Sequence, residues 1–133
     1  MSGERPGFTL IEIIIVLSII GIILGLAVPQ YKSSMIRARE TVLKENLFVL
    51  RKLIDQYHQD KGKYPLSLQV LVQDGYLRSI PLDPMTKSSE TWVQVPETLS
   101  PEDGTPTAPP GIVDVKSGSQ EKSPVDGSFY NTW

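Results

Sequence analysis

One uninterrupted apolar run, residues 8–28, constrains this chain more than any other feature. The run reads FTLIEIIIVLSIIGIILGLAV and holds a single charged residue, Glu12. As an α-helix it extends for about 31 Å, which matches a hydrocarbon core of about 30 Å. A cleaved secretory signal has a shorter apolar region and a small-residue cleavage site. The run fits neither feature, so we predict a retained membrane helix over residues 8–28, ahead of a discarded signal or a buried helix of a soluble protein.

Glu12 is out of place in such a helix. A carboxylate near the centre of a membrane helix costs roughly 2.5–3.5 kcal/mol, and ionisable groups within membranes are functional candidates by default. Two opposite charges in an apolar bundle offset one another when they pair, whereas a lone charge is strongly penalised. The alternative to a functional role is a neutral carboxyl that is tolerated at the membrane interface.

A short polar leader, MSGERPG, precedes the run and ends in Gly7. The string G-F-T-L-I-E, followed by the apolar run, resembles the class III signal of type IV pilins and type II secretion pseudopilins. The resemblance implies that residues 1–7 are a leader and that a prepilin peptidase cuts between Gly7 and Phe8 and then methylates the amino terminus of Phe8. It also implies that Glu12, four residues after Phe8, pairs with the terminal amine of a neighbouring subunit and sets the register between subunits.

The distribution of basic residues disagrees with the orientation that the resemblance implies. Lys32, Arg37 and Arg39 follow the apolar run, whereas Arg5 alone precedes it. The positive-inside rule places the more basic flank in the cytoplasm. In the family, however, the peptidase acts on the leader from the cytoplasm. We therefore expect a single-pass protein of the bacterial inner membrane with its C-terminal head in the periplasm.

Helical periodicity continues past the apolar run, so residues 29–61 are expected to extend the same helix as an amphipathic continuation. Pro29 should kink or loosen this helix without ending it, and Gly62 is the expected C-cap. The expected buried stripe, with steps mostly of three and four, consists of Tyr31, Met35, Val42, Leu43, Leu47, Leu50, Ile54 and Tyr57. Charged residues fill most of the other positions, among them Glu40, Lys44 and Arg51. We interpret them as a solvated face, and His58 as a surface residue, without a site role.

Residues 62–133 are expected to form a periplasmic head on this helix. The stretch KGKYPLSLQVLVQDGYLRSIPLDP contains a turn and then a short helix closed by Asp74-Gly75. It resembles the segment after the long helix in major pseudopilins, which extends the resemblance to roughly residues 7–84. Three runs with strand character, at 91–95, 111–115 and 128–131, predict an antiparallel sheet packed on the helix. The fold class is therefore α+β and pilin-like, with long loops, of which the proline-rich stretch 96–110 has no assigned role.

The resemblance further implies calcium binding in the last loop, before a final tryptophan. Asp126 and Trp133 stand where that ending would lie, but residues 117–122 lack the expected aspartates, and Lys122 would oppose a cation. Calcium prefers six to eight oxygen ligands, so Asp126 and Glu121 are a thin set. We keep Asp126 as the candidate calcium ligand and favour a loop held by turns and hydrogen bonds.

Composition excludes several other kinds of function. The net charge of -2 is too balanced for affinity based on phosphate neutralisation, so no nucleic-acid partner is expected. The chain has no cysteine and one histidine, which removes disulfides, thiolate sites and histidine-rich metal sites. No nucleophile–base pair is visible, and we expect no enzyme.

The resemblance instead implies a structural subunit of a type II secretion pseudopilus. Such a subunit assembles from the inner membrane into a helical filament that helps to export folded proteins. The implied partners are further copies of the chain, the prepilin peptidase, minor pseudopilins, the inner-membrane assembly platform and membrane lipid. The alternative within the same superfamily is a type IV pilin of a surface filament used for adhesion, motility or DNA uptake.

Overall fold

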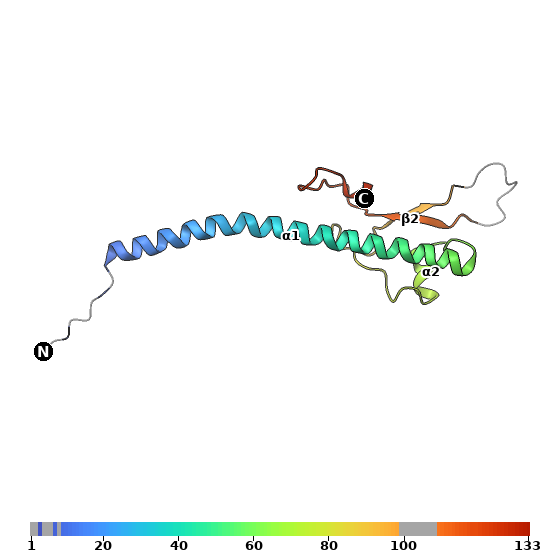
Figure 1. The fold of residues 1–133 in the computed structure, drawn as a ribbon, viewed down its shortest axis with the longest axis horizontal. Helices are drawn as coiled ribbons and strands as arrows, with labels where there is room; N and C mark the ends of the chain where they lie inside the picture. The colour runs from blue at the N-terminus through green and yellow to red at the C-terminus, as the bar shows by residue number, and fades with distance from the viewer. Residues whose placement is uncertain (1–2, 4–6, 8, 99–108) are drawn as a thin grey trace. The chain divides into compact units, whose positions relative to one another are not determined.

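The computed structural model describes residue 3, residue 7, residues 9–98 and residues 109–133. Phe8, Arg5 and most of the proline-rich stretch lie outside the described residues. The elements follow one another in the order α1, α2, β1, β2 and a terminal 3₁₀ turn (Figure 1). The chain divides into two units, Met1–Ile36 and Arg37–Trp133. Helix α1, Leu10–Lys61, contributes to both units.

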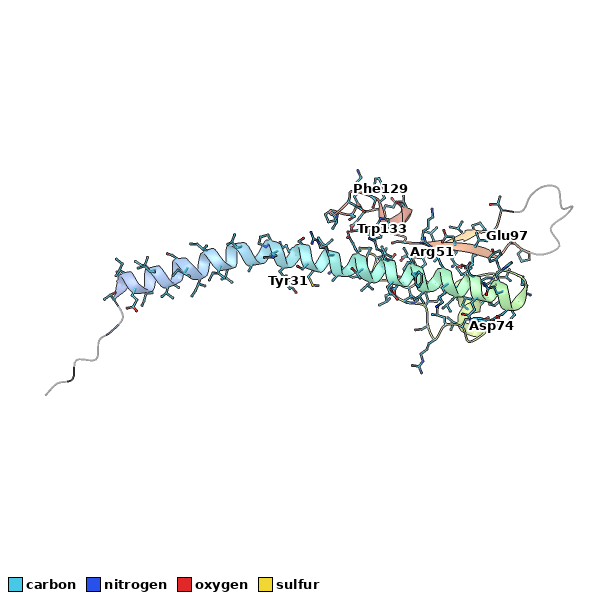
Figure 2. All side chains as sticks on the ribbon, viewed as in Figure 1. Tyr31, Arg51, Asp74, Glu97, Phe129 and Trp133 are labelled. Carbon is cyan, nitrogen blue, oxygen red and sulfur yellow. The ribbon has the colours of Figure 1, made fainter. Side chains whose placement is uncertain are left out.

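In the first unit, the stretch of α1 up to Val28 is apolar on all sides apart from Glu12 and Ser18, and its side chains project around the whole helix (Figure 2). It is long and apolar enough to cross a membrane, because an 18-residue window reaches a mean hydropathy of 2.9. No part of that window is buried within the described structure. A helix satisfies its main-chain hydrogen bonds internally, which is what a hydrocarbon environment demands. These features are those of a membrane-anchoring helix.

Helix α1 continues through Pro29 and ends where the sequence predicts. Gly62 follows the last helical residue with a φ of 71°, and its N–H donates to the carbonyl of His58 at 2.8 Å. Glycine adopts this left-handed conformation without the steric cost of a Cβ, so the chain turns out of the helix here. A kink at Pro29 stays a prediction.

In the second unit, one face of α1 is buried at a regular helical spacing. The predicted stripe is confirmed from Leu43 onward, and its buried members are Leu43, Leu47, Leu50, Ile54 and Tyr57. The prediction is wrong for Tyr31, Met35 and Val42, which remain exposed. It is also wrong for Glu40, assigned to the solvated face but buried at 6% exposure, because two hydroxyl groups from the end of the chain cover its carboxylate.

Helix α2, Leu68–Gln73, is the short helix that the sequence predicts after the first turn of the head. Its first N–H, on Leu68, donates to the side-chain oxygen of Gln94 at 3.0 Å, so a residue of β1 caps this helix. Gly75, with a φ of 81°, closes it. Leu68 and Leu71 turn inward and bury their side chains.

Strands β1, Val93–Pro96, and β2, Ile112–Lys116, pair antiparallel with Val93 opposite Lys116, and a register irregularity follows Val95. The hairpin and α2 lie on different sides of α1 (Figure 1). Ile112 and Val115 of β2 are buried, which is the side of the hairpin that faces the core. Two of the three predicted strands are thus confirmed.

The third predicted strand, at 128–131, is wrong. Phe129 makes only an isolated bridge with Lys122, and Tyr130–Thr132 form a 3₁₀ turn. The N–H of Trp133 donates to the carbonyl of Tyr130 at 3.2 Å, so this carbonyl is bonded within the turn and not to a neighbouring strand. The hydroxyl of Tyr130 is drawn inward to Glu40, and the chain coils at this point instead of extending.

The core of the second unit forms around the buried stripe of α1. The elements that close it are α2, β2, the 3₁₀ turn and Trp92, whose indole N–H donates to the carbonyl of Pro81 at 2.8 Å. The additional core residues are Leu68, Leu71, Trp92, Ile112, Val115 and Tyr130. A long N-terminal helix packed on a small antiparallel sheet is an α+β, pilin-like fold, as predicted.

Leu50→Ala is expected to destabilise the head strongly, because Leu50 is fully buried in this core. Removing such a side chain costs about 2–5 kcal/mol through lost transfer free energy and the cavity left behind. Phe48→Ala is the matched control on the same helix, since Phe48 is 64% exposed. Urea unfolding of the full chain in detergent, followed by the fluorescence of Trp92 and Trp133, measures both variants. Equal effects of the two substitutions would contradict the placement of the core.

Candidate functional site

Gly7 is not required by the local structure. No other heavy atom of the described structure lies within 4 Å of the position that a Cβ would take, and the residue is exposed. Its φ also lies outside the left-handed range that favours glycine. The fold itself therefore gives no reason for a glycine here. Phe8, its predicted partner in the cleavage site, lies outside the described residues.

Glu12 lies in the first turn of α1, three residues after Thr9. Its main-chain N–H donates to the hydroxyl of Thr9 at 3.3 Å, and the N–H of Ile13 donates to the carbonyl of Thr9 at 3.3 Å. Thr9 therefore acts as the cap that begins the helix. The first turn carries a partial positive charge, which favours a carboxylate there. The pattern T-x-x-E, a capping-box signature, is the signal in the sequence that indicates this role for Thr9.

The only other polar side chain of the apolar run past Glu12 is satisfied within the helix. Ser18 donates its hydroxyl to the carbonyl of Ile14 at 2.7 Å. This bond satisfies the hydroxyl group within the helix, so the group needs no partner from an apolar environment. Glu12 therefore stands out in the apolar run, because its exposed side chain is the single charged one among residues 9–28.

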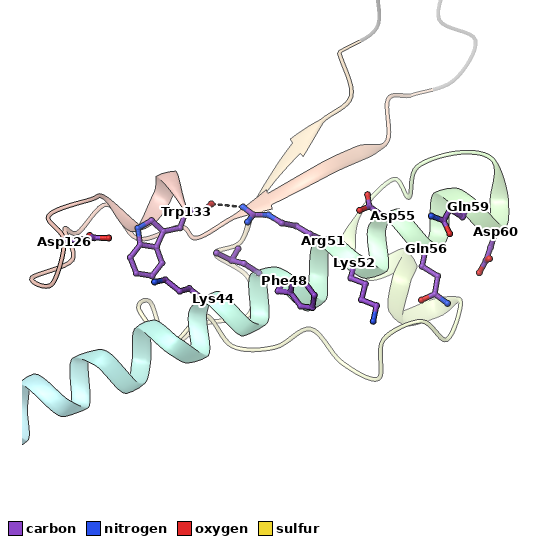
Figure 3. Close-up of a pocket in the computed structure, with 11 residues that line it drawn as sticks. Lys44, Phe48, Arg51, Lys52, Asp55, Gln56, Gln59, Asp60, Asp126 and Trp133 are labelled. Carbon is purple, nitrogen blue, oxygen red and sulfur yellow. Dashed lines mark hydrogen bonds between the residues drawn. The ribbon is translucent and has the colours of Figure 1, made fainter.

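In the second unit, Arg51 holds the end of the chain on α1. Its Nε lies 2.7 Å from Oδ1 of Asp114 in β2. Its Nη2 donates to the carbonyl of Val115 at 3.0 Å. It also donates to the main-chain oxygen of Trp133 at 2.7 Å (Figure 3). One guanidinium thus joins α1 to β2 and to the terminal turn. The sequence does not reveal this role, because Arg51 looks like any other charged residue of the helix.

An open groove of about 890 Å³ runs along the same face of α1 (Figure 3). At one end, the ammonium of Lys44 lies 4.7 Å from the centre of the Trp133 ring, a cation–π contact. Further along, the lining side chains include Lys52, Asp55 and Asp60, so charges of both signs face the groove. Nothing in this lining combines a nucleophile with a base.

Asp126, the candidate calcium ligand, is engaged with its own loop. Its Oδ1 accepts hydrogen bonds from the main-chain N–H of Ser128 at 2.9 Å and from the hydroxyl of Ser128 at 2.6 Å. These bonds, and the positive charge of Lys44, lower the pKa of the Asp126 carboxyl. Within residues 9–98 and 109–133, no three histidine, cysteine or acidic residues gather closely enough to hold a metal ion. This donor set does not fit the six to eight oxygens of a calcium shell.

His58 packs against an aromatic ring of the head. Its ring stacks on Tyr64 with 4.1 Å between ring centres. This contact joins the end of α1 to the first turn of the head.

Comparisons with known proteins agree with this geometry. The family described as the prokaryotic N-terminal methylation motif matches residues 5–28. The type II secretion system core protein G of Pseudomonas aeruginosa is 36% identical over 97 residues, which are 61% of this chain and 68% of that protein. The protein of the same name from Klebsiella michiganensis is 28% identical over 146 residues, 98% of this chain and 94% of its own. No solved structure gives a significant match.

A methylation motif at the start of a long apolar helix, followed by a head built on that helix, defines a pilin-like protein. A third relative, the type II secretion system core protein G of Escherichia coli (strain K12), is 30% identical over 99 residues and is covered to 68%. The chain belongs to the family of type II secretion system core protein G, the major pseudopilins. The members of this family are structural subunits and not enzymes.

Arg51→Met is expected to loosen the C-terminal segment, because it removes the ion pair to Asp114 and two hydrogen bonds to main-chain oxygens. The groups are about one-third exposed, so a loss of about 1–2 kcal/mol is expected. Hydrogen exchange of residues 112–133 should accelerate in this variant. Lys52→Met, the neighbouring exposed cation, is the matched control. Unchanged exchange in Arg51→Met would refute the clamp.

Proposed function

We propose that this chain is a structural subunit of the type II secretion pseudopilus, made as a precursor with residues 1–7 as its leader. A prepilin peptidase cuts between Gly7 and Phe8 and methylates the new amino terminus of Phe8. The mature subunit waits in the inner membrane, anchored by residues 8–28, with its head in the periplasm. It is then extracted into a periplasmic helical filament of many copies that helps to export folded proteins.

The observation that carries this proposal is the position of the methylation motif. The motif covers residues 5–28, the junction between the polar leader and the apolar helix. Gly7 lies in this junction without a structural reason to be glycine. Recognition by a peptidase supplies the reason that the fold lacks. The relatives reported above carry the name of the type II secretion system, which favours secretion over the surface pilin as the alternative.

Filament assembly follows from the exposed apolar helix of the first unit. Its isoleucine, leucine and valine side chains have no partner among the described residues. They require either lipid or other copies of the same helix. After cleavage, the amine of Phe8 would carry a positive charge four residues from the negative charge of Glu12. In a bundle of copies, each amine can neutralise the Glu12 of a neighbour, which offsets the cost of both charges. Minor pseudopilins and the inner-membrane assembly platform are the further proposed partners.

Gly7→Ala is expected to block removal of the leader, so that the precursor accumulates in cells that contain the peptidase. Gly3→Ala is the matched control, because Gly3 is also exposed and unrestrained by the described structure. Intact-mass spectrometry distinguishes the products, since processing removes residues 1–7 and adds one methyl group. Processed Gly7→Ala protein at the wild-type level would overturn the cleavage assignment.

Glu12→Ala is expected to insert into the membrane normally but to assemble poorly, because the amine of a neighbouring subunit loses its counter-ion. The bond between residue 12 and Thr9 survives the change, since its donor is the main-chain N–H. Ser18→Ala, in the same apolar run, is the control. Membrane fractionation measures insertion, and the yield of sheared filaments measures assembly. A wild-type filament yield from Glu12→Ala would count against the pairing.

A further inference from the structure

Three serines of the C-terminal segment are buried, although serine is mostly exposed in proteins. Ser117, Ser119 and Ser123 are 0%, 6% and 2% exposed. Each hydroxyl oxygen accepts a main-chain N–H two residues further along the chain, at 3.1–3.3 Å. The same hydroxyl groups of Ser117 and Ser123 are free to donate elsewhere. The burial of all three indicates that they hold the segment together from within.

Asp83 receives the first of these hydroxyls. Its carboxylate is fully buried, and Oδ2 accepts the hydroxyl of Ser117 at 2.6 Å and the N–H of Gly118 at 3.3 Å. Oδ1 accepts the N–H of Met85 at 2.9 Å. Hydrogen bonds to an ionised carboxylate are roughly twice as strong as neutral ones. Asp83 therefore joins the loop after α2 to the segment that follows β2.

Glu40 receives the second hydroxyl. Its Oε1 accepts the hydroxyl of Ser123 at 2.5 Å and that of Tyr130 at 2.8 Å. Burial, together with the hydrogen bond to Glu40, raises the pKa of Tyr130 to about 12, so its phenol remains a donor at neutral pH. Within residues 37–98 and 109–133, the only ion pair is that of Arg51 and Asp114. The buried carboxyl groups of Glu40 and Asp83 are therefore partnered by hydroxyl groups and not by cationic side chains.

Three main-chain oxygens of the same segment are also occupied. The carbonyl of Ser128 accepts the N–H of Ser123 at 2.8 Å, and the carbonyl of Ser123 accepts the N–H of Gly127 at 2.9 Å. The carbonyl of Glu121 accepts the N–H of Tyr130 at 3.0 Å. A cation site in a loop needs several such oxygens to converge on one point. These three carbonyls are instead directed at amides of the same segment.

From these contacts we propose that the C-terminal segment of this pseudopilin is held against the rest of the head without any bound cation. We call this arrangement the serine lock; it consists of Ser117, Ser119 and Ser123 with the carboxylates of Asp83 and Glu40. It fixes the segment that the family resemblance expects calcium to fix. Its donors are hydroxyls and main-chain amides that belong to the chain, so folding of the head is independent of the calcium concentration. Lys44 supplies the positive charge next to Asp126.

Calcium titration of the full wild-type chain in detergent tests the proposal. A site with a dissociation constant of about 1 mM would raise the melting midpoint by several degrees in about 10 mM calcium. We expect the midpoint to differ by less than about 1 °C between calcium and EGTA, below what such a site would produce. A higher midpoint in calcium, or a lower one after dialysis against EGTA, would overturn the proposal.

Terbium provides a second measurement that needs no variant. Terbium bound in a calcium site of this loop would be excited by Trp133, whose indole N–H donates to the hydroxyl of Ser128 at 2.6 Å. We expect no sensitised emission. Emission that calcium displaces and that Asp126→Asn abolishes would establish a cation site and refute the lock.

Variants test the lock itself. Ser123→Ala removes one of two hydroxyl donors to Glu40 and two acceptor contacts within the loop, so the melting midpoint should fall by several degrees, equally with calcium and with EGTA. Ser79→Ala, at an exposed serine, is the matched control. A Ser123→Ala midpoint equal to that of the control would refute the lock. If Ser123→Ala fails to fold, the wild-type titration still decides. These readouts need neither cleavage nor filament assembly, so they can fail independently of the proposed function.

Discussion

Burial of one face of α1 is the interaction on which the head depends. Two short strands, a six-residue helix and a 3₁₀ turn cannot form a stable core by themselves. Leu43, Leu50 and Ile54 of α1 supply the fully buried wall against which these elements pack. The helix is thus part of the domain and not merely a stalk. This requirement explains why the buried part of the stripe begins only within the second unit.

The same helix meets a different demand in the first unit. Up to Val28 its residues are apolar on every face, so no single side of this stretch is distinguished as a contact face for its own chain. Such a helix is stable in lipid or among copies of itself, because its main-chain hydrogen bonds are internal. Thr9 caps the helix and places Glu12 in its positive first turn. In the proposed filament this charge would pair with the amine of a neighbouring subunit, which would favour assembly in a defined register.

Polar groups decide the arrangement of the head as much as apolar ones do. Glu40 and Arg51 join α1 to the last part of the chain, and Asp83 joins the loop after α2 to it. An unpartnered buried carboxylate is costly, so each of these contacts penalises any other placement of the C-terminal segment. Charge-assisted hydrogen bonds thereby give a segment with little regular secondary structure one defined path.

The amino-acid sequence determined the features that depend on neighbours along the chain: the extent of α1, its end at Gly62, the short α2, the membrane-length run and the methylation motif. Periodicity, capping and hydropathy are local, so they can be read without a fold. Only the tertiary structure decided the roles of Glu40 and Arg51 and the coiled end of the chain at Tyr130. Glu40 bonds to residues 83 and 90 positions away, and Arg51 to residues 63 to 82 positions away. A charged helix residue looks the same in sequence whether water or a distant hydroxyl covers it, because its burial depends on what the rest of the chain places against it.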